Sequence, residues 1–145
     1  MNPKGLRTWV EVDARALRAN FLAFRKLVGS ETKLMAVVKS NGYGHGLREV
    51  GNIFEECGAD FLGVDSVVEG LTLREAGIKV PILVLGYTLP ERVEEAREAG
   101  LSLTVSALEH LEVLKSLKNG KKLSVHVKID TGMHRHGFFV EDVPR

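Results

Sequence analysis

The sequence predicts an α/β fold, namely a parallel sheet that forms part of a (β/α)8 TIM barrel. Five short apolar runs rich in Val, Ile and Leu recur roughly 20 to 26 residues apart, and each is bounded by Gly, Pro, Ser or Asp. Amphipathic helical patterns fill the intervals between these runs. This alternation is typical of β/α units, in which helices cover buried parallel strands.

The elements follow in order along the chain. The expected strands are residues 34–38, 61–64, 81–85, 101–105 and 123–129. The expected helices are residues 13–28, 66–76, 90–99 and 106–117, with one more beginning near residue 46. Side chains that can cap a helix stand at several of the predicted starts. Asp13 and Ser66 are two of them, and Ser106 with Glu109 has the spacing of a capping box.

A closed barrel and an open doubly wound sheet share this local pattern. The glycine-rich turn 41–46 after the first strand lacks the G-x-G-x-x-G order of dinucleotide-binding folds, which favours the barrel. Eight β/α units need more residues than this chain of 145 holds. We therefore expect about five of the eight strands, with residues 1–145 forming the N-terminal part of the barrel domain.

Composition excludes several classes of function. The 20 basic and 19 acidic residues leave a net charge of +1, which gives no electrostatic basis for nucleic-acid binding. The longest apolar stretch, residues 80–85, is far too short for a membrane span. Cys57 is the single cysteine, which favours a cytoplasmic protein without disulfides. His134 and His136 lack further ligands nearby, so no metal site is expected.

The fifth predicted strand carries polar groups on one face. His126, Lys128 and Asp130 alternate with Val and Ile residues, so the apolar face suits the helix layer and the polar face points into the barrel. Titratable groups in a barrel interior are costly unless they pair or bind something. The alternative is an edge strand with one face in water.

Lys39 ends the first predicted strand, where the active sites of such barrels lie. A lysine amine there is a nucleophile able to form a Schiff base, although a surface lysine would fit the same position. In the turn that follows, Tyr43 could donate its hydroxyl, and the helix start after Gly46 favours a phosphate. An ordinary tight turn is the alternative. Arg135, after the fifth strand, is a cationic fork suited to a carboxylate or a phenolate oxygen.

Residues 36–46 read A-V-V-K-S-N-G-Y-G-H-G, which closely resembles the pyridoxal-phosphate signature A-V-V-K-A-N-A-Y-G-H-G of alanine racemases. Residues 128–137, K-I-D-T-G-M-H-R-H-G, resemble the family's K-x-D-T-G-M-x-R-x-G segment, with His136 where Leu is more common. Residues 8–13 resemble the family's opening strand, and residues 81–86 resemble its third barrel strand. These four stretches have the same order and spacing as in the family.

The resemblance implies a cytoplasmic homodimeric enzyme that uses pyridoxal 5'-phosphate to interconvert L- and D-alanine, supplying D-alanine for peptidoglycan. Lys39 would hold the cofactor and act as one of two catalytic bases. Tyr43 would bind the cofactor phosphate, and Leu85 would pack near its ring. Arg135 would face the cofactor's phenolic oxygen and the substrate carboxylate. Lys128 matches a lysine that is carbamylated in many members and positions this arginine.

The resemblance also implies that the second base is a tyrosine of a C-terminal β-domain, supplied by the other subunit and outside residues 1–145. The substrate pocket would lie largely outside them too. Two alternatives therefore stay open. One is a related racemase for serine, lysine or a broader set of amino acids, and the other is an inactive fragment that keeps only the fold. We expect this chain on its own to be poorly stable and inactive.

Overall fold

The computed structural model describes residues 5–117 and 120–143 and shows one sheet of five parallel strands in the order β1-β2-β3-β4-β5. The strands are β1 (Met35–Val37), β2 (Phe61–Val64), β3 (Ile82–Val84), β4 (Ser102–Val105) and β5 (Ser124–Val127). Each strand pairs with the next one along the chain. An open doubly wound sheet reverses its strand order, whereas a barrel adds strands in one direction. The order therefore confirms the prediction of a partial barrel.

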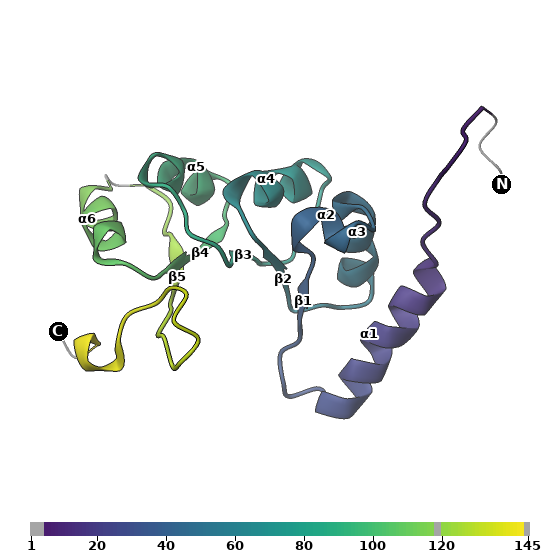
Figure 1. Ribbon diagram of the computed structural model, residues 1–145, viewed down its shortest axis with the longest axis horizontal. Coiled ribbons are helices and arrows are strands. Elements are labelled where there is room, and N and C mark those ends of the chain that lie inside the picture. Colours follow the sequence, from purple (N-terminus) through teal and green to yellow (C-terminus); the bar gives the residue numbers. More distant parts are fainter. Residues whose placement is uncertain (1–4, 118–119, 144–145) are drawn as a thin grey trace.

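One helix, α1, precedes the sheet, and helices follow β1 to β4 along the chain (Figure 1). They are α1 (Ala14–Val28), α2 (Lys39–Tyr43), α3 (Leu47–Glu56), α4 (Val67–Glu75), α5 (Val93–Glu98) and α6 (Leu108–Ser116), with 3-10 turns η1 (Pro90–Arg92) and η2 (Val140–Asp142). Helices α3 to α6 form an arc along one face of the sheet, and the segment after β5 runs below it (Figure 1). The arc corresponds to part of a barrel's outer helix layer.

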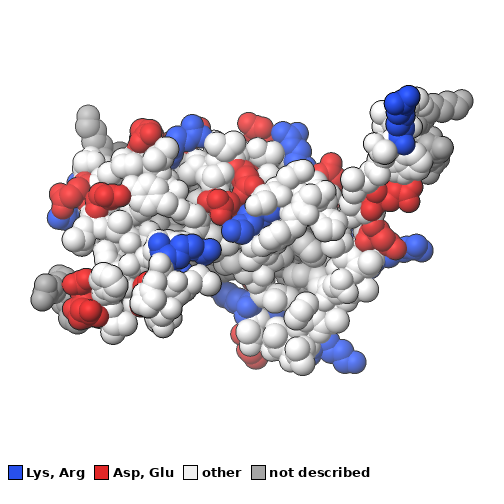
Figure 2. All heavy atoms as spheres, viewed as in Figure 1, with Lys and Arg blue, Asp and Glu red and all other residues white. Residues whose placement is uncertain are grey.

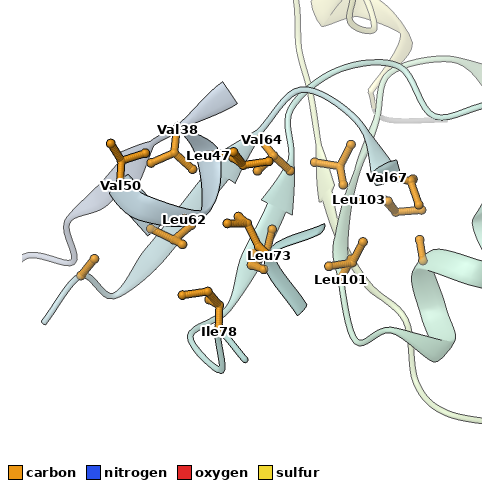
Figure 3. Close-up of a cluster of buried hydrophobic side chains, with 14 of the residues drawn as sticks. Val38, Leu47, Val50, Leu62, Val64, Val67, Leu73, Ile78, Leu101 and Leu103 are labelled. Atoms are coloured by element: carbon orange, nitrogen blue, oxygen red, sulfur yellow. The ribbon is translucent and has the colours of Figure 1, made fainter. Parts of the chain in front are cut away.

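The hydrophobic core lies between the sheet and this helix arc (Figure 3). Leu62, Val64, Ile82 and Val84 point into it from the central strands and are completely buried. Paired residues of neighbouring parallel strands lie on the same face of the sheet. Along each strand the side chains alternate, so the residues next to these core positions face the opposite side. That opposite side is the barrel lumen.

The lumen face changes character across the sheet. Residues of β1 to β3 on it are apolar or glycine, whereas β4 and β5 contribute Ser102, Thr104, Ser124 and His126. His126 stands in register with Thr104, and its ring lies edge-on to that of Phe61, with 6.3 Å between the centroids. The predicted orientation of the fifth strand is therefore confirmed for His126.

Two of the predicted helix caps are present. The Asp13 carboxylate accepts the amide of Arg15 at 2.8 Å, and the Ser66 hydroxyl accepts that of Glu69 at 3.3 Å. The capping box at Ser106 is wrong, because α6 begins one residue later, after Ala107, with no side-chain cap.

A buried histidine explains the later start of α6. His110 is 4% exposed, its Nε2 lies 2.9 Å from the Thr88 carbonyl oxygen, and the Ser106 amide faces its Nδ1 at 3.5 Å. The buried ring thus fixes the start of α6 from within the fold.

The N-terminal segment differs from its expected form. Residues 8–13, which resemble an opening strand, form no strand in the described chain and extend away from the body of the molecule (Figure 1). An isolated strand has no neighbour to satisfy its amides and carbonyls, so it does not form by itself. Trp9 Nε1 instead donates to a carboxylate oxygen of Glu11 at 2.7 Å.

Charge is distributed without a large patch of one sign on the face drawn in Figure 2, where acidic and basic side chains are intermixed. Across residues 5–117 and 120–143, no helix combines the length and the apolar character needed to span a membrane.

Candidate active site

A cavity of about 620 Å³ opens at the carboxyl ends of the strands, on the lumen side of the sheet. Four of the residues singled out from the sequence line it, namely Lys39, Leu85, Lys128 and Arg135. They lie just beyond the ends of β1, β3 and β5 and in the loop that follows β5, so the parallel sheet itself brings them together. The volume falls within the range of small-molecule sites in proteins.

Lys39 lies two residues after the end of β1, and its amine meets a partner to which the sequence analysis assigned no role. Nζ of Lys39 donates to Oδ1 of Asp65 at 3.2 Å, and Asp65 also lines the cavity. The Lys39 side chain is 32% exposed and that of Asp65 is 56% exposed. A pair this open to water is weakly held, so the Lys39 amine stays available to a ligand.

The position of Asp65 in the lumen could have been predicted from the sequence. Asp65 comes directly after β2 and has the same parity as Phe61 and Gly63, which lie on the lumen face. The same reasoning that placed Lys128 in the lumen would have placed Asp65 there.

The backbone after Lys39 forms a left-handed turn. Ser40, Asn41, Gly42 and Tyr43 have φ angles of 54°, 55°, 62° and 53°. For residues other than glycine, this conformation costs roughly 1–2 kcal/mol each. Clustered strain of this kind is typical of functional sites and persists only where neighbouring contacts impose it.

Several hydrogen bonds impose the turn. The Gly42 amide donates to the Val38 carbonyl at 2.9 Å, and the Asn41 side-chain oxygen accepts the Leu47 amide at 3.0 Å. At Gly42, an added Cβ would lie 2.6 Å from a methyl group of Val50, so the turn packs directly against α3. The chain therefore leaves Lys39 in one fixed direction.

Tyr43 is not brought into the cavity. It is 60% exposed and borders a separate hollow of about 170 Å³ with Leu17, Val38 and Phe54. Its predicted role in phosphate binding stays a prediction.

The loop after β5 holds Arg135 in the cavity wall. The Asp130 carboxylate accepts the amides of Gly132 at 2.9 Å and His134 at 3.0 Å. These two hydrogen bonds lower the pKa of Asp130 below its ordinary value, because they stabilise the charged form. The Phe138 amide donates to the Lys128 carbonyl at 2.9 Å, which closes the loop back onto the strand.

Unlike His126 and Lys128, Asp130 does not line the cavity. Its side chain is 8% exposed and its carboxylate is used within the loop. The reason is that the regular strand ends at Val127, and the chain turns before the alternation reaches residue 130. Lys128 lines the cavity, as its place on the polar face predicts, and its amide donates to the Val105 carbonyl at 2.8 Å, which continues the β4–β5 ladder.

The cavity combines cationic and apolar walls. Lys39, Lys128 and Arg135 face it together with one carboxylate, that of Asp65, so the lining favours an anionic ligand. Leu85 supplies an apolar surface. The residues present thus fit an aromatic aldehyde that carries a phosphate and a phenolate, as pyridoxal 5'-phosphate does. No cluster of three or more potential metal ligands occurs among the residues that the structure describes.

Two histidines of the lining were not assigned roles from the sequence. His126 projects from β5 beside Thr104, and His136 follows Arg135. Nε2 of His136 is buried and finds no hydrogen-bond partner within the described part of the chain.

Known proteins of similar sequence identify the family of this chain. The family model for the alanine racemase N-terminal domain matches residues 12–145. The alanine racemase of Symbiobacterium thermophilum is 45% identical over 150 residues, covering 100% of this chain and 39% of the relative. That of Desulforamulus reducens is 42% identical over 132 residues, covering 90% of this chain and 36% of the relative.

Solved structures show the same similarity. Alanine racemase from Clostridium difficile 630 superposes with a TM-score of 0.88 at 39% identity, covering 94% of this chain and 37% of that structure. A histidine racemase from Leuconostoc mesenteroides superposes with a TM-score of 0.78 at 32% identity, covering 87% of this chain and 34% of that structure. The chain thus spans less than two fifths of the length of these relatives. The matched domain and the cavity around Lys39 together establish that this chain belongs to the alanine racemase family.

Proposed function

We propose that the protein containing this chain is an alanine racemase that depends on pyridoxal 5'-phosphate. The observation that carries the proposal is the meeting of Lys39, Lys128 and Arg135 in one cavity, inside a domain that matches this family. The sequence motifs at residues 36–46 and 128–137 are far apart in the chain and supply these three side chains. Their convergence supports a working site rather than an inherited fold alone.

Each lining residue has a defined task in this proposal. Lys39 would hold the cofactor through its amine and move the proton at the substrate's Cα on one face. When bound, pyridoxal phosphate supplies the electron sink that makes this Cα proton acidic. Arg135 holds the substrate carboxylate and the phenolic oxygen through its planar fork of donors. Leu85 would pack against the ring from the cavity lining. Tyr43, which borders a separate hollow in this structure, is proposed to bind the phosphate.

Lys128 resolves a problem of charge. Two unmodified cations, Lys128 and Arg135, repel each other in one partly enclosed cavity. Carbamylation of the Lys128 amine would replace its positive charge by a negative one, and the resulting anion would pair with Arg135 and fix its orientation.

Racemisation needs an acid or base on both faces of the substrate. Lys39 serves one face. We propose that a tyrosine outside these residues, from a C-terminal β-domain of a second subunit, serves the other face, which makes the enzyme a homodimer. We also propose a cytoplasmic location and a role of the product D-alanine in peptidoglycan.

A second candidate function differs from the first in its substrate. A histidine racemase shares this fold over 87% of the chain, so the fold accommodates amino acids other than alanine. A racemase for serine, lysine, histidine or a broader set is therefore the alternative function. Racemisation assays with L-alanine and with each of these amino acids decide between them, and faster turnover of another amino acid would overturn the alanine proposal.

Covalent trapping tests the site itself. The protein expressed from its whole reading frame is incubated with pyridoxal phosphate, reduced with borohydride and mapped by mass spectrometry. We expect the label on Lys39, its loss in Lys39→Ala, and full labelling in the control Lys33→Ala, which changes a lysine outside the cavity lining. Label on another lysine would contradict the assignment.

A further inference from the structure

We propose that Glu69 is a positioning residue for Lys39. Its carboxylate joins the ends of β1 and β2 at the cavity and thereby fixes the direction of the Lys39 amine. The inference deepens the proposed function, on which the role of Lys39 depends, but the contacts that carry it belong to Glu69 alone.

Glu69 lies in the first turn of α4 and is half-buried. One oxygen, Oε1, accepts the amide of Ser40 at 2.7 Å. The other, Oε2, accepts the amide of Asp65 at 2.8 Å. Ser40 is the residue directly after Lys39, and Asp65 is the residue whose carboxylate meets the Lys39 amine. One side chain therefore holds both neighbours of the reactive group.

The Glu69 carboxylate links β1 and β2 beyond the point where their strand pairing ends. The last register pair between β1 and β2 is Val37 with Gly63. Beyond it, the two backbones separate into different loops, and no strand pairing aligns Lys39 with Asp65. The Glu69 carboxylate replaces that pairing with two hydrogen bonds to an ionised acceptor, which are stronger than bonds between neutral groups.

The Glu69 hydrogen bonds matter because they stabilise the left-handed turn after Lys39. Ser40 and Asn41 both have positive φ, a conformation that side-chain-bearing residues adopt only under constraint. Glu69 Oε1 accepts the Ser40 amide and, at 3.4 Å, that of Asn41. Without this acceptor we expect the turn to relax, and the Lys39 side chain to lose its fixed direction.

Glu69 also has an ordinary structural role, which the test must separate. It stands three residues after the N-cap Ser66, where a glutamate favours a helix start. In a capping box its carboxylate would bond the amide of Ser66 itself. Here that carboxylate reaches one residue further, to Asp65, and across to Ser40.

The experiment compares Glu69→Ala and Glu69→Gln with Glu75→Ala. Glu75 lies on the same helix, and its exposed carboxylate contacts Arg48 at 3.3 Å rather than the strand ends. All variants are made in the whole reading frame and studied without cofactor. Amide hydrogen exchange at Ser40 and Asp65 should accelerate about tenfold or more in Glu69→Ala. It should stay unchanged in Glu75→Ala.

Chemical labelling of Lys39 gives the second readout. Acetylation of Lys39 at one pH is measured against that of Lys115, an exposed lysine on α6. We expect the Lys39 to Lys115 ratio to change severalfold in Glu69→Ala and to stay constant in Glu75→Ala. A purely helix-capping role would lower stability without moving this ratio, so an unchanged ratio in a folded Glu69→Ala protein would overturn the proposal.

Glu69→Gln keeps the test decisive if Glu69→Ala fails to fold. Its single side-chain oxygen can replace only one of the two carboxylate oxygens, either the one at Ser40 or the one at Asp65, while its NH2 group faces the other amide. One of the two amides, that of Ser40 or that of Asp65, should therefore exchange faster while the other stays protected. Wild-type protection at both positions would overturn the proposal. Failure of the cofactor to label Lys39 in the wild-type protein would instead refute the proposed function and leave the Glu69 result standing.

Discussion

Substitution of Gly42 by alanine tests the left-handed turn most directly. Gly42 has φ of 62°, and an added Cβ would lie 2.6 Å from Cγ2 of Val50. Val50 is 2% exposed and β-branched, so its side chain has little freedom to move away. The left-handed conformation costs alanine about 1–2 kcal/mol, and overpacking against a buried side chain adds about 1–3 kcal/mol. Gly42→Ala should therefore lower the free energy of unfolding by about 2–5 kcal/mol.

Gly58→Ala is the matched control. Gly58 has φ of 83°, and its added Cβ would meet nothing within 4 Å, so only the conformational cost of about 1–2 kcal/mol applies. Urea unfolding of the protein from its whole reading frame measures both variants. In a Val50→Ala background, Gly42→Ala should cost no more than Gly58→Ala, because the clashing methyl groups are gone. Equal losses for the two glycines in the wild-type background would refute the reasoning.

The remaining predictions concern the loop, the modified lysine and the chain alone. Asp130 has a lowered pKa, so its stabilising hydrogen bonds are present above about pH 4 and are lost as the pH falls through that pKa. The Gly132 amide resonance should report this transition, and Asp130→Asn should abolish it. Lys128→Ala should reduce racemisation, with partial rescue by a small carboxylate. Mass spectrometry without acid treatment should show an added carboxyl group on Lys128. If the lysine is unmodified, neither the rescue nor the added group would appear. The 145-residue chain alone should self-associate or unfold without cooperativity, because β1 and β5 present unpaired edges. Size-exclusion chromatography and a melt test this, and a stable monomer would contradict it.

The strands and their lumen face could be predicted because they follow local patterns. Alternation along residues 123–129 placed His126 and Lys128 on the side where the structure has them. The run of short apolar segments likewise predicted all five strands. A parallel sheet then brings strand ends together without further information, which is why Lys39, Leu85 and Lys128 meet as expected.

What could not be predicted depends on contacts between distant residues. The start of α6 is set by burial of His110 against the Thr88 carbonyl, which lies 22 residues earlier in the chain. The glycine-rich turn was recognisable, but its left-handed path through Ser40 and Asn41 depends on Glu69 from another unit. Local sequence propensity predicts neither contact.

The division of the lumen face explains where the site lies. On β1 to β3 the face presents apolar groups such as Met35 and Leu83, and these form a wall of low polarity below Leu85. On β4 and β5 it presents hydroxyl and imidazole groups, and Thr104 satisfies its own hydroxyl by donating to the Val84 carbonyl at 2.7 Å. A flat aromatic ring with charged substituents needs both kinds of surface, since its faces are apolar and its edges carry charge. Lys39 stands on the apolar side with Asp65 as its partner, and Lys128 and Arg135 lie toward the other side. The part of the barrel that the structure describes therefore separates an apolar wall from the polar and charged groups of the cavity.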